Sequence, residues 1–288
     1  MSSKLIGTLG LVIILTSGFY ASLTRSASNH SQNFMARTGA KNTQARSLAS
    51  QFAPLAGHEL DERIEVSLQA VFAPSTGFDD NDNVEVVAHG DLPNSCYTLA
   101  DSFFEILEDG ITIDIHQYAT LQKEGICAQG AALPPHLSML VPFTRDITIG
   151  RLNAADYVIQ YHKPGSITAR RALQITRASA PTIDENPYAI VTNAQVGDVQ
   201  VAGDSITVTL SGLLNSTCTE LTDEIQVIKQ NDVYVILPTL KVKPEIMCAQ
   251  MLKPFSRKVE LGKAIGGEFL VHVRSMNGQS VNRVFEVQ

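Results

Sequence analysis

Four cysteines are the side chains best able to form a covalent cross-link or a reactive thiol: Cys96, Cys127, Cys218 and Cys248. Four cysteines allow three disulfide pairings, and the spacing between them selects none of the three. No Cys-x-x-Cys motif occurs, so the sequence indicates no thioredoxin-like redox site. The pairing must therefore be inferred from the organisation of the whole chain.

An acidic run at residues 79–83 is the clearest candidate for a metal site. Asp79, Asp80 and Asp82 offer carboxylate oxygens, the ligands that Ca²⁺ prefers. The run lacks the glycine and the terminal bidentate glutamate of an EF-hand loop. Clustered Asp and Asn are also typical of ordinary turns. We expect a solvated acidic loop here, with calcium binding as the alternative.

No other residues form a recognisable catalytic or cofactor-binding pattern. The seven histidines show neither His-Glu-x-x-His nor His-x-His spacing. Residues 203–205, Gly-Asp-Ser, match a hydrolase nucleophile turn over three positions only, and they lie between expected strands rather than before a helix. No phosphate loop or glycine-rich dinucleotide motif is present. The sequence therefore predicts no cofactor and no catalytic residue.

Two stretches of the chain repeat each other in four separated blocks. Residues 90–99, 126–129, 142–145 and 157–173 align with residues 212–221, 247–250, 254–257 and 269–285. This agreement predicts a tandem duplication, with about nine extra residues in the first copy. Each copy carries one cysteine pair, so the duplication predicts the disulfides Cys96–Cys127 and Cys218–Cys248. Closing a loop of about 30 residues stabilises the folded state by about 3.5–4 kcal/mol in the chain-entropy model.

Within each copy, apolar residues recur at every second position, which is typical of half-buried strands. The matched alternating residues are Ile111, Ile113 and Ile115 in the first copy, and Val233, Val235 and Leu237 in the second. Asn277-Gly278 follows another such run and is a strong hairpin signal.

These patterns predict an all-β chain with two tandem immunoglobulin-like β-sandwich domains, each holding one disulfide. The expected domains span residues 58–177 and 191–288, with a linker at 178–190. The chain has no Trp, and about 30 residues between cysteines is short for the immunoglobulin inter-sheet bridge. The expectation is thus an immunoglobulin-like sandwich that departs from the antibody pattern.

The N-terminal 28 residues read as an export signal or an uncleaved anchor. Lys4 precedes an uninterrupted apolar run at residues 5–15, and small residues suited to cleavage follow. Residues 29–57 are polar and lack periodicity, so a disordered stalk is expected. Either reading places the remaining chain in the periplasm, at the cell surface or outside the cell, where disulfides form.

Charge is distributed unevenly along the chain. Residues 1–56 carry five basic and no acidic side chains, which leaves 22 − 5 = 17 basic against 29 acidic residues in the rest. Binding to nucleic acid needs clustered Lys and Arg, so it is not expected of this acidic body. Contact with a membrane is expected only through the N-terminal segment, if that segment is uncleaved.

The repeated pattern Gly-x-Leu-Pro-x-x-Cys, Cys-x-Gln and Pro-Phe resembles a module of exported bacterial envelope proteins and lipoproteins. The first copy shows it at Gly90-Asp91-Leu92-Pro93-Asn94-Ser95-Cys96, and the resemblance covers residues 84–175 and 206–288. No biochemical activity comes with that module. The resemblance implies a fold and a location, and nothing about chemistry.

Together these observations predict an exported, non-catalytic envelope protein that binds an unknown protein or envelope ligand. An extracellular protease inhibitor and a secreted hydrolase are the alternatives. The candidate binding loop is the insertion of the first copy, at Leu133, Pro134, Pro135 and His136, because paired prolines lower the ordering cost of binding. A simple surface excursion, or an extra edge strand from Leu137 to Val141, is the competing interpretation.

Overall fold

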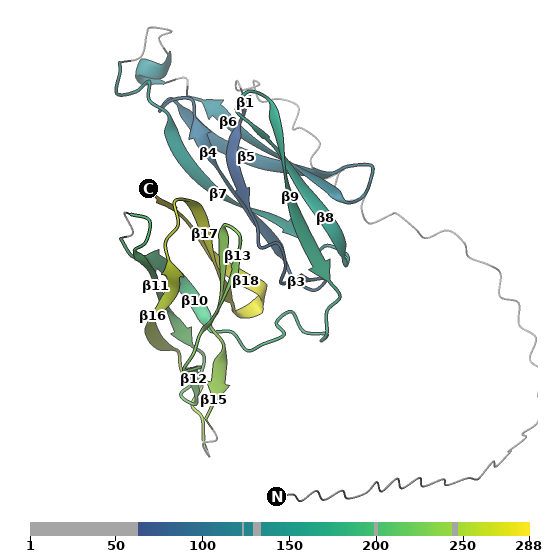
Figure 1. The fold of residues 1–288 in the computed structure, drawn as a ribbon, viewed down its shortest axis with the longest axis vertical. Coiled ribbons are helices and arrows are strands. Elements are labelled where there is room, and N and C mark those ends of the chain that lie inside the picture. The colour runs from purple at the N-terminus through teal and green to yellow at the C-terminus, as the bar shows by residue number, and fades with distance from the viewer. Residues whose placement is uncertain (1–62, 123, 129–133, 199–200, 244–246) are drawn as a thin grey trace, which may run out of the picture. The chain divides into compact units, whose positions relative to one another are not determined.

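The computed structural model describes residues 63–122, 124–128, 134–198, 201–243 and 247–288 (Figure 1). The predicted signal or anchor at residues 1–28, the predicted stalk at 29–57 and Leu133 of the candidate loop lie outside these residues. No helix in the described part of the chain has the length and apolar character needed to cross a bilayer. The regular secondary structure of the described residues is β-strand except for two short 3₁₀ helices, which confirms the all-β prediction.

We refer to residues 63–177 as the first half and to residues 187–288 as the second half. The elements of the first half are β1 (Arg63–Val66), β2 (Leu68–Phe72), β3 (Phe78–Asp79), β4 (Val84–Leu92), β5 (Tyr97–Ile106), β6 (Thr112–Leu121), the 3₁₀ helix η2 (Gly125–Ala128), β7 (Val141–Gly150), β8 (Ala155–Lys163) and β9 (Ile167–Thr176). The elements of the second half are β10 (Ile190–Val196), β11 (Ser205–Leu214), β12 (Thr219–Leu221), β13 (Gln226–Gln230), β14 (Val233–Leu237), β15 (Leu240–Val242), β16 (Lys253–Lys263), β17 (Gly267–Ser275), the 3₁₀ helix η3 (Met276–Gly278) and β18 (Gln279–Val287).

Two sheets form the first half. One has the order β1-β6-β8-β9-β3, with β5 also paired to β6, and the other has the order β2-β4-β7. Alternating side chains of both sheets share one core, including Val86 of β4, Ile115 of β6 and Ile159 of β8. Two sheets that bury their apolar faces against each other form a β-sandwich.

The strand pairs of the second half correspond to those of the first. The sheet β10-β11-β16 matches β2-β4-β7, and β13-β14-β17-β18 matches β5-β6-β8-β9. Both halves even share a parallel pair, β6 with β8 and β14 with β17. The sheets of an immunoglobulin fold are antiparallel, so these pairs differ from that pattern and the immunoglobulin-like form is not confirmed.

A β-bulge also recurs at one place in both halves. Opposite Gly150 the register of β4 shifts between Val84 and Glu85, and opposite Gly262 the register of β11 shifts in the same way. Both glycines have a positive φ, of 90° and 97°. A bulge of this type places one residue in the left-handed region, which glycine enters without steric cost.

The predicted match between β6 and β14 was wrong by one residue. The sequence comparison aligned Val235 with Ile113. In the structure Ile113 pairs with Ile159, whereas Tyr234 pairs with Val271, the residue equivalent to Ile159. A shift of one residue moves every side chain of a strand to the opposite face. Tyr234 is therefore a core residue, and Val235 faces away from that core.

That outward face of the second half packs against the first half. Val233, Val235 and Leu270 form a buried cluster with Phe72 and Val87 of the first half. Polar contacts flank the cluster. Both guanidinium nitrogens of Arg171 donate to the carboxylate of Asp232, and the side chain of Gln230 bonds Ser75 and Thr76.

Strand pairing of the second half begins inside the range predicted as a linker. β10 starts at Ile190, and Tyr188 forms a β-bridge with Thr239. The Leu240 amide also donates to the Pro187 carbonyl, 2.7 Å away. The Asn-Pro composition of this segment is typical of a loop, which is why the sequence predicted a linker. Proline lacks an amide hydrogen, but its carbonyl can still accept a backbone hydrogen bond.

Candidate functional site

Both predicted disulfides are present. Cys96 bonds Cys127 and Cys218 bonds Cys248, with Cα atoms 5.6 and 5.4 Å apart, and no cysteine is free. All four thiols are consumed, so none is available as a nucleophile.

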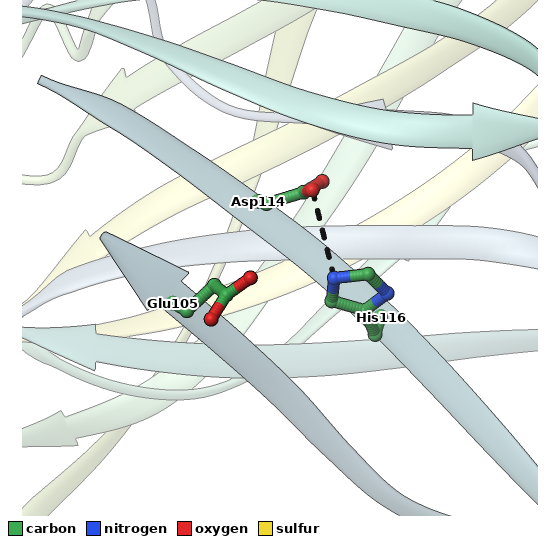
Figure 2. A group of neighbouring side chains, drawn as sticks. All are labelled: Glu105, Asp114 and His116. Atoms are coloured by element: carbon green, nitrogen blue, oxygen red, sulfur yellow. Dashed lines mark ion pairs between the residues drawn. The ribbon is translucent and has the colours of Figure 1, made fainter. Parts of the chain in front are cut away.

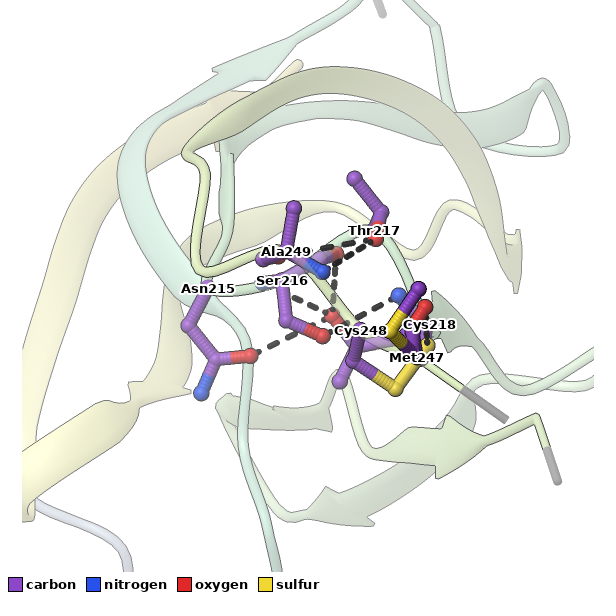
Figure 3. The surroundings of a disulfide bond; sticks show 8 residues. Asn215, Ser216, Thr217, Cys218, Met247, Cys248 and Ala249 are labelled. Atoms are coloured by element: carbon purple, nitrogen blue, oxygen red, sulfur yellow. Dashed lines mark hydrogen bonds between the residues drawn. A yellow bond between two sulfur atoms is a disulfide. The ribbon is translucent and has the colours of Figure 1, made fainter. Parts of the chain in front are cut away.

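The turn before the first cysteine is stabilised in the same way in each half. The Cys96 amide donates to Asn94 Oδ1 at 2.9 Å, and the Cys218 amide donates to Ser216 Oγ at 3.1 Å (Figure 3). Asn and Ser side chains that bond an amide two residues later create such turns. Each disulfide therefore joins a rigid turn to the segment that precedes β7 or β16.

Backbone hydrogen bonds place the insertion of the first half slightly earlier than the sequence comparison did. The Thr217 amide donates to the Ala249 carbonyl, and the equivalent Ser95 amide donates to the Leu137 carbonyl. Leu137 thus takes the place of Ala249. The extra residues are then 128–136, and the sequence after them, Met-Leu-x-Pro, is the same in both halves.

This correspondence shows exposed apolar side chains at equivalent positions beside each disulfide. We name them the first tip, formed by Ile126, Met139 and Leu140, and the second tip, formed by Met247, Met251 and Leu252. Their exposed fractions run from 45% for Ile126 to 88% for Met247. Single exposed apolar residues are common on proteins, but equivalent sets at two places are a specific surface feature.

An open groove of about 520 Å³ lies at the second tip. Its lining includes Cys218, Cys248, Val242, Met251 and Leu252. The disulfide forms part of the groove wall, so the wall is covalently fixed. A rigid concave apolar surface suits an apolar side chain of a partner.

The described part of the candidate binding loop is a tight turn. The Leu137 amide donates to the Pro134 carbonyl at 2.8 Å, and Ser138 Oγ donates to the Pro135 carbonyl at 2.9 Å. Pro135 and His136 are exposed. Residues 137–140 contain no strand, and β7 begins only at Val141. The alternative of an extra edge strand through Leu137 was therefore wrong.

The acidic run at residues 79–83 is a connection between the halves rather than a solvated loop. Asp82 accepts hydrogen bonds from Arg274 of the second half, at 2.9 Å, and from the Asp79 amide. Asp80 accepts one from the Ala178 amide. Asp79 Oδ1 accepts a hydrogen bond from the Asn81 amide. Burial raises the pKa of Asp79. These bonds occupy oxygens that calcium would need, and they leave the calcium alternative without support.

A second cluster of ionisable side chains lies on the outer face of the first half. Glu105 of β5 and Asp114 and His116 of β6 place possible ligand atoms within 4.8 Å of one another (Figure 2). His162 of β8 joins them, because its Nε2 lies 3.8 Å from Asp114 Oδ2. His116 Nε2 lies 3.6 Å from the same oxygen.

Sequence spacing does not reveal this cluster, because Glu105 and His162 are distant in sequence from Asp114 and His116. The available signal was Asp114-x-His116 on an expected strand, since residues two apart on a strand share a face. The contributions of Glu105 and His162 depend on the pairing of β5, β6 and β8, which sequence spacing does not show.

The second half of the chain matches a known family model. Residues 208–287 match the family model described as the ORF11 beta-sandwich domain. The matched range extends from β11 to β18 and includes the second disulfide. No curated protein and no solved structure matches the chain. The match supports a β-sandwich in the second half and assigns no activity.

Proposed function

We propose that this chain is an exported, non-catalytic binding protein made of two tandem β-sandwich modules. The two tips contact a partner protein of the cell envelope. The observation that carries the proposal is the equivalent placement of exposed apolar side chains beside both disulfides. Two disulfides fit an oxidising compartment, which supports export.

The chemistry of the tips suits a protein partner. Methionine is flexible and polarisable, so it adapts to irregular apolar surfaces. Met139 and Met251 are 67% and 57% exposed and each is followed by an exposed leucine. The adjacent disulfide restrains the backbone and so lowers the conformational entropy that the backbone loses on binding.

Two equivalent tips also permit bivalent capture. A partner that presents two linked apolar sites binds both tips of one chain with an enhanced overall affinity. The insertion at residues 128–136 exists only beside the first tip, so it distinguishes the two contacts. We therefore assign the insertion a role in selectivity rather than in the basic interaction.

The test is photo-cross-linking of the full chain in envelope extracts, with paired substitutions at the tips. Met139→Ser/Leu140→Ser and Met251→Ser/Leu252→Ser are expected to lose cross-linked partners. Ile167→Ser on β9 is the matched control, because Ile167 is 62% exposed and lies away from the disulfides in sequence. Unchanged partners in both tip variants, with circular dichroism showing a native fold, contradict the proposal.

A loop exchange tests the selectivity role. Replacing residues 128–136 by the direct connection of the second half is expected to preserve folding and to remove only the partners captured through the first tip. Capture through the second tip is the internal control.

A further inference from the structure

We propose that His116, His162, Asp114 and Glu105 form a binding site for a divalent transition-metal ion, with Zn²⁺ the best fit. All four side chains belong to one sheet of the first half, on strands β5, β6 and β8. Two imidazoles and two carboxylates are a ligand set that zinc accepts in four-coordinate sites.

Asp114 is the central observation. It is only 7% exposed, and its Oδ1 is buried with no hydrogen-bond partner. A buried carboxylate oxygen without a partner costs stability, and such exceptions need a cause. A cation bound at Oδ1 supplies the missing partner.

The partners of Asp114 and His116 fix which atoms remain for a metal. Glu65 Oε1 lies 2.6 Å from His116 Nδ1 and can only accept when ionised, so Nδ1 carries a proton. That hydrogen bond leaves Nε2 to act as a ligand. Pairing of the second ring nitrogen with a carboxylate is the usual way in which proteins orient metal-binding histidines.

The same logic orients Gln160. Arg170 Nε donates to Gln160 Oε1, because guanidinium groups only donate, so Gln160 Nε2 must face Asp114 Oδ2, at 3.2 Å. Gln160 therefore positions one oxygen of Asp114 and leaves Oδ1 free. Gln160, Arg170 and Glu65 are positioning residues for the four ligands.

The distances suit a metal more closely than direct contact. Two zinc ligands with bonds of about 2.0–2.1 Å at a tetrahedral angle lie about 3.3 Å apart. The Nε2 atoms of His116 and His162 lie 3.6 and 3.8 Å from Oδ2, the oxygen of Asp114 that Gln160 occupies. These distances are beyond normal hydrogen-bond length, so both imidazoles lie beside the Asp114 carboxylate without bonding it directly. The side chain of His162 is 38% exposed, which leaves an entry path from solvent.

The site is specific to the first half. The strand pairing aligns Asp114 with Val235 and His116 with Leu237, and His162 aligns with Arg274. In the second half this face packs against the first half through the apolar residues Val233, Val235 and Leu270, with Arg274 paired to Asp82. The equivalent face of the first half carries the ionisable cluster instead, so these side chains are not needed to build the sandwich.

Calorimetric titration of the purified full chain with zinc chloride tests the proposal, in a buffer without chelators. One Zn²⁺ is expected to bind per chain. His116→Ala and His162→Ala are each expected to weaken binding at least about 10- to 100-fold, the range found for residues that only orient a ligand. His136→Ala is the matched control, because His136 is an exposed imidazole outside the cluster. The zinc affinity of this variant is expected to equal that of the wild type.

Thermal unfolding supplies a second readout that separates binding from misfolding. Saturating Zn²⁺ is expected to raise the Tm of the wild type and of His136→Ala, but not that of Asp114→Asn, since a ligand bound only by the folded state stabilises it. Absence of saturable one-to-one binding by the wild type overturns the proposal and leaves His116 with a hydrogen bond to Glu65 alone. Wild-type affinity in the double variant His116→Ala/His162→Ala also overturns it, because the metal then binds elsewhere.

Discussion

At the scale of single residues, His272 of β17 is the most strongly perturbed ionisable group. Its ring is 2% exposed, Nδ1 lies 2.8 Å from Asn282 Oδ1, and Nε2 is buried without a partner. Burial, and then the charge of Arg274, lower its pKa from 6.5 to about 3. His272 is therefore neutral in the folded protein at every pH near neutrality.

This perturbation predicts a loss of stability in acid. The folded-state pKa is below the unfolded one, so the unfolded chain binds the extra proton as the pH falls from 6.5 towards 3. The free energy of unfolding should then fall by up to about 1.4 kcal/mol per pH unit in that window. His272→Gln places at position 272 the residue type that the first half has at the equivalent position, Gln160. This variant is expected to lose the contribution of His272 to the pH dependence of the unfolding free energy. Urea unfolding of both proteins at pH 7.5, 5.5 and 4.5 measures it.

The difference between the two proteins isolates His272 from other groups. Burial raises the pKa of Asp79 and Asp146, so these carboxyl groups bind protons more readily in the folded state and oppose the effect in acid. Both are present in wild type and variant. Parallel pH profiles for the two proteins are the result that contradicts the prediction.

At the scale of elements, the strands of the second half are interrupted where those of the first run through. β6 is continuous over Thr112–Leu121, whereas its counterpart is divided into β14 and β15. Pro238 lies between these two strands and has no amide to donate. The short pair β12–β15 therefore depends on the adjacent disulfide for its stability. The Cys218 carbonyl accepts a hydrogen bond from the Lys243 amide, directly after β15.

Removing the second disulfide is expected to loosen that end of the half. Cys218→Ser/Cys248→Ser should lower the free energy of unfolding by about 3.5–4 kcal/mol. Amide exchange should quicken in β12 and β15, while the buried strand β17 keeps its protection relative to global unfolding. Exchange measured by mass spectrometry tests this, with Cys96→Ser/Cys127→Ser as the comparison. Equal loosening of β17 and β15 argues against a local role for the disulfide.

Sequence patterns predicted the elements of this fold better than their register. The repeated Cys, Gly and Pro-Phe positions identified both disulfides and the matched strands, because these residues have strict conformational or covalent roles. The apolar pattern aligned β14 one residue away from its true place, because Val233–Leu237 are all apolar and either register gives an apolar core face. The candidate metal site depends on the pairing of β5, β6 and β8, so only Asp114 and His116 had a sequence signal.

At the scale of the whole described chain, a buried ion pair joins the halves. Arg274 Nη2 lies 2.9 Å from Asp82 Oδ2, and both side chains are at least nine-tenths buried. Arg274 also donates to the Gly77 carbonyl and lies over the ring of Phe78, 4.7 Å from its centroid. Because these partners come from the first half and Arg274 from the second, separation of the halves breaks all these contacts and exposes the apolar cluster that lies between the halves.

The halves are therefore expected to unfold together, in one cooperative transition by calorimetry. Arg274→Met should lower the free energy of unfolding by about 3–5 kcal/mol, because it leaves the carboxylate of Asp82 buried and uncompensated. The double variant Asp82→Asn/Arg274→Met should recover much of that loss, since replacing both members of a buried pair removes the stranded charge. Chemical unfolding of the two single variants and the double variant gives the coupling energy between the residues. Two separate transitions in the wild type, or additive effects of the two substitutions, show that the halves are stabilised independently.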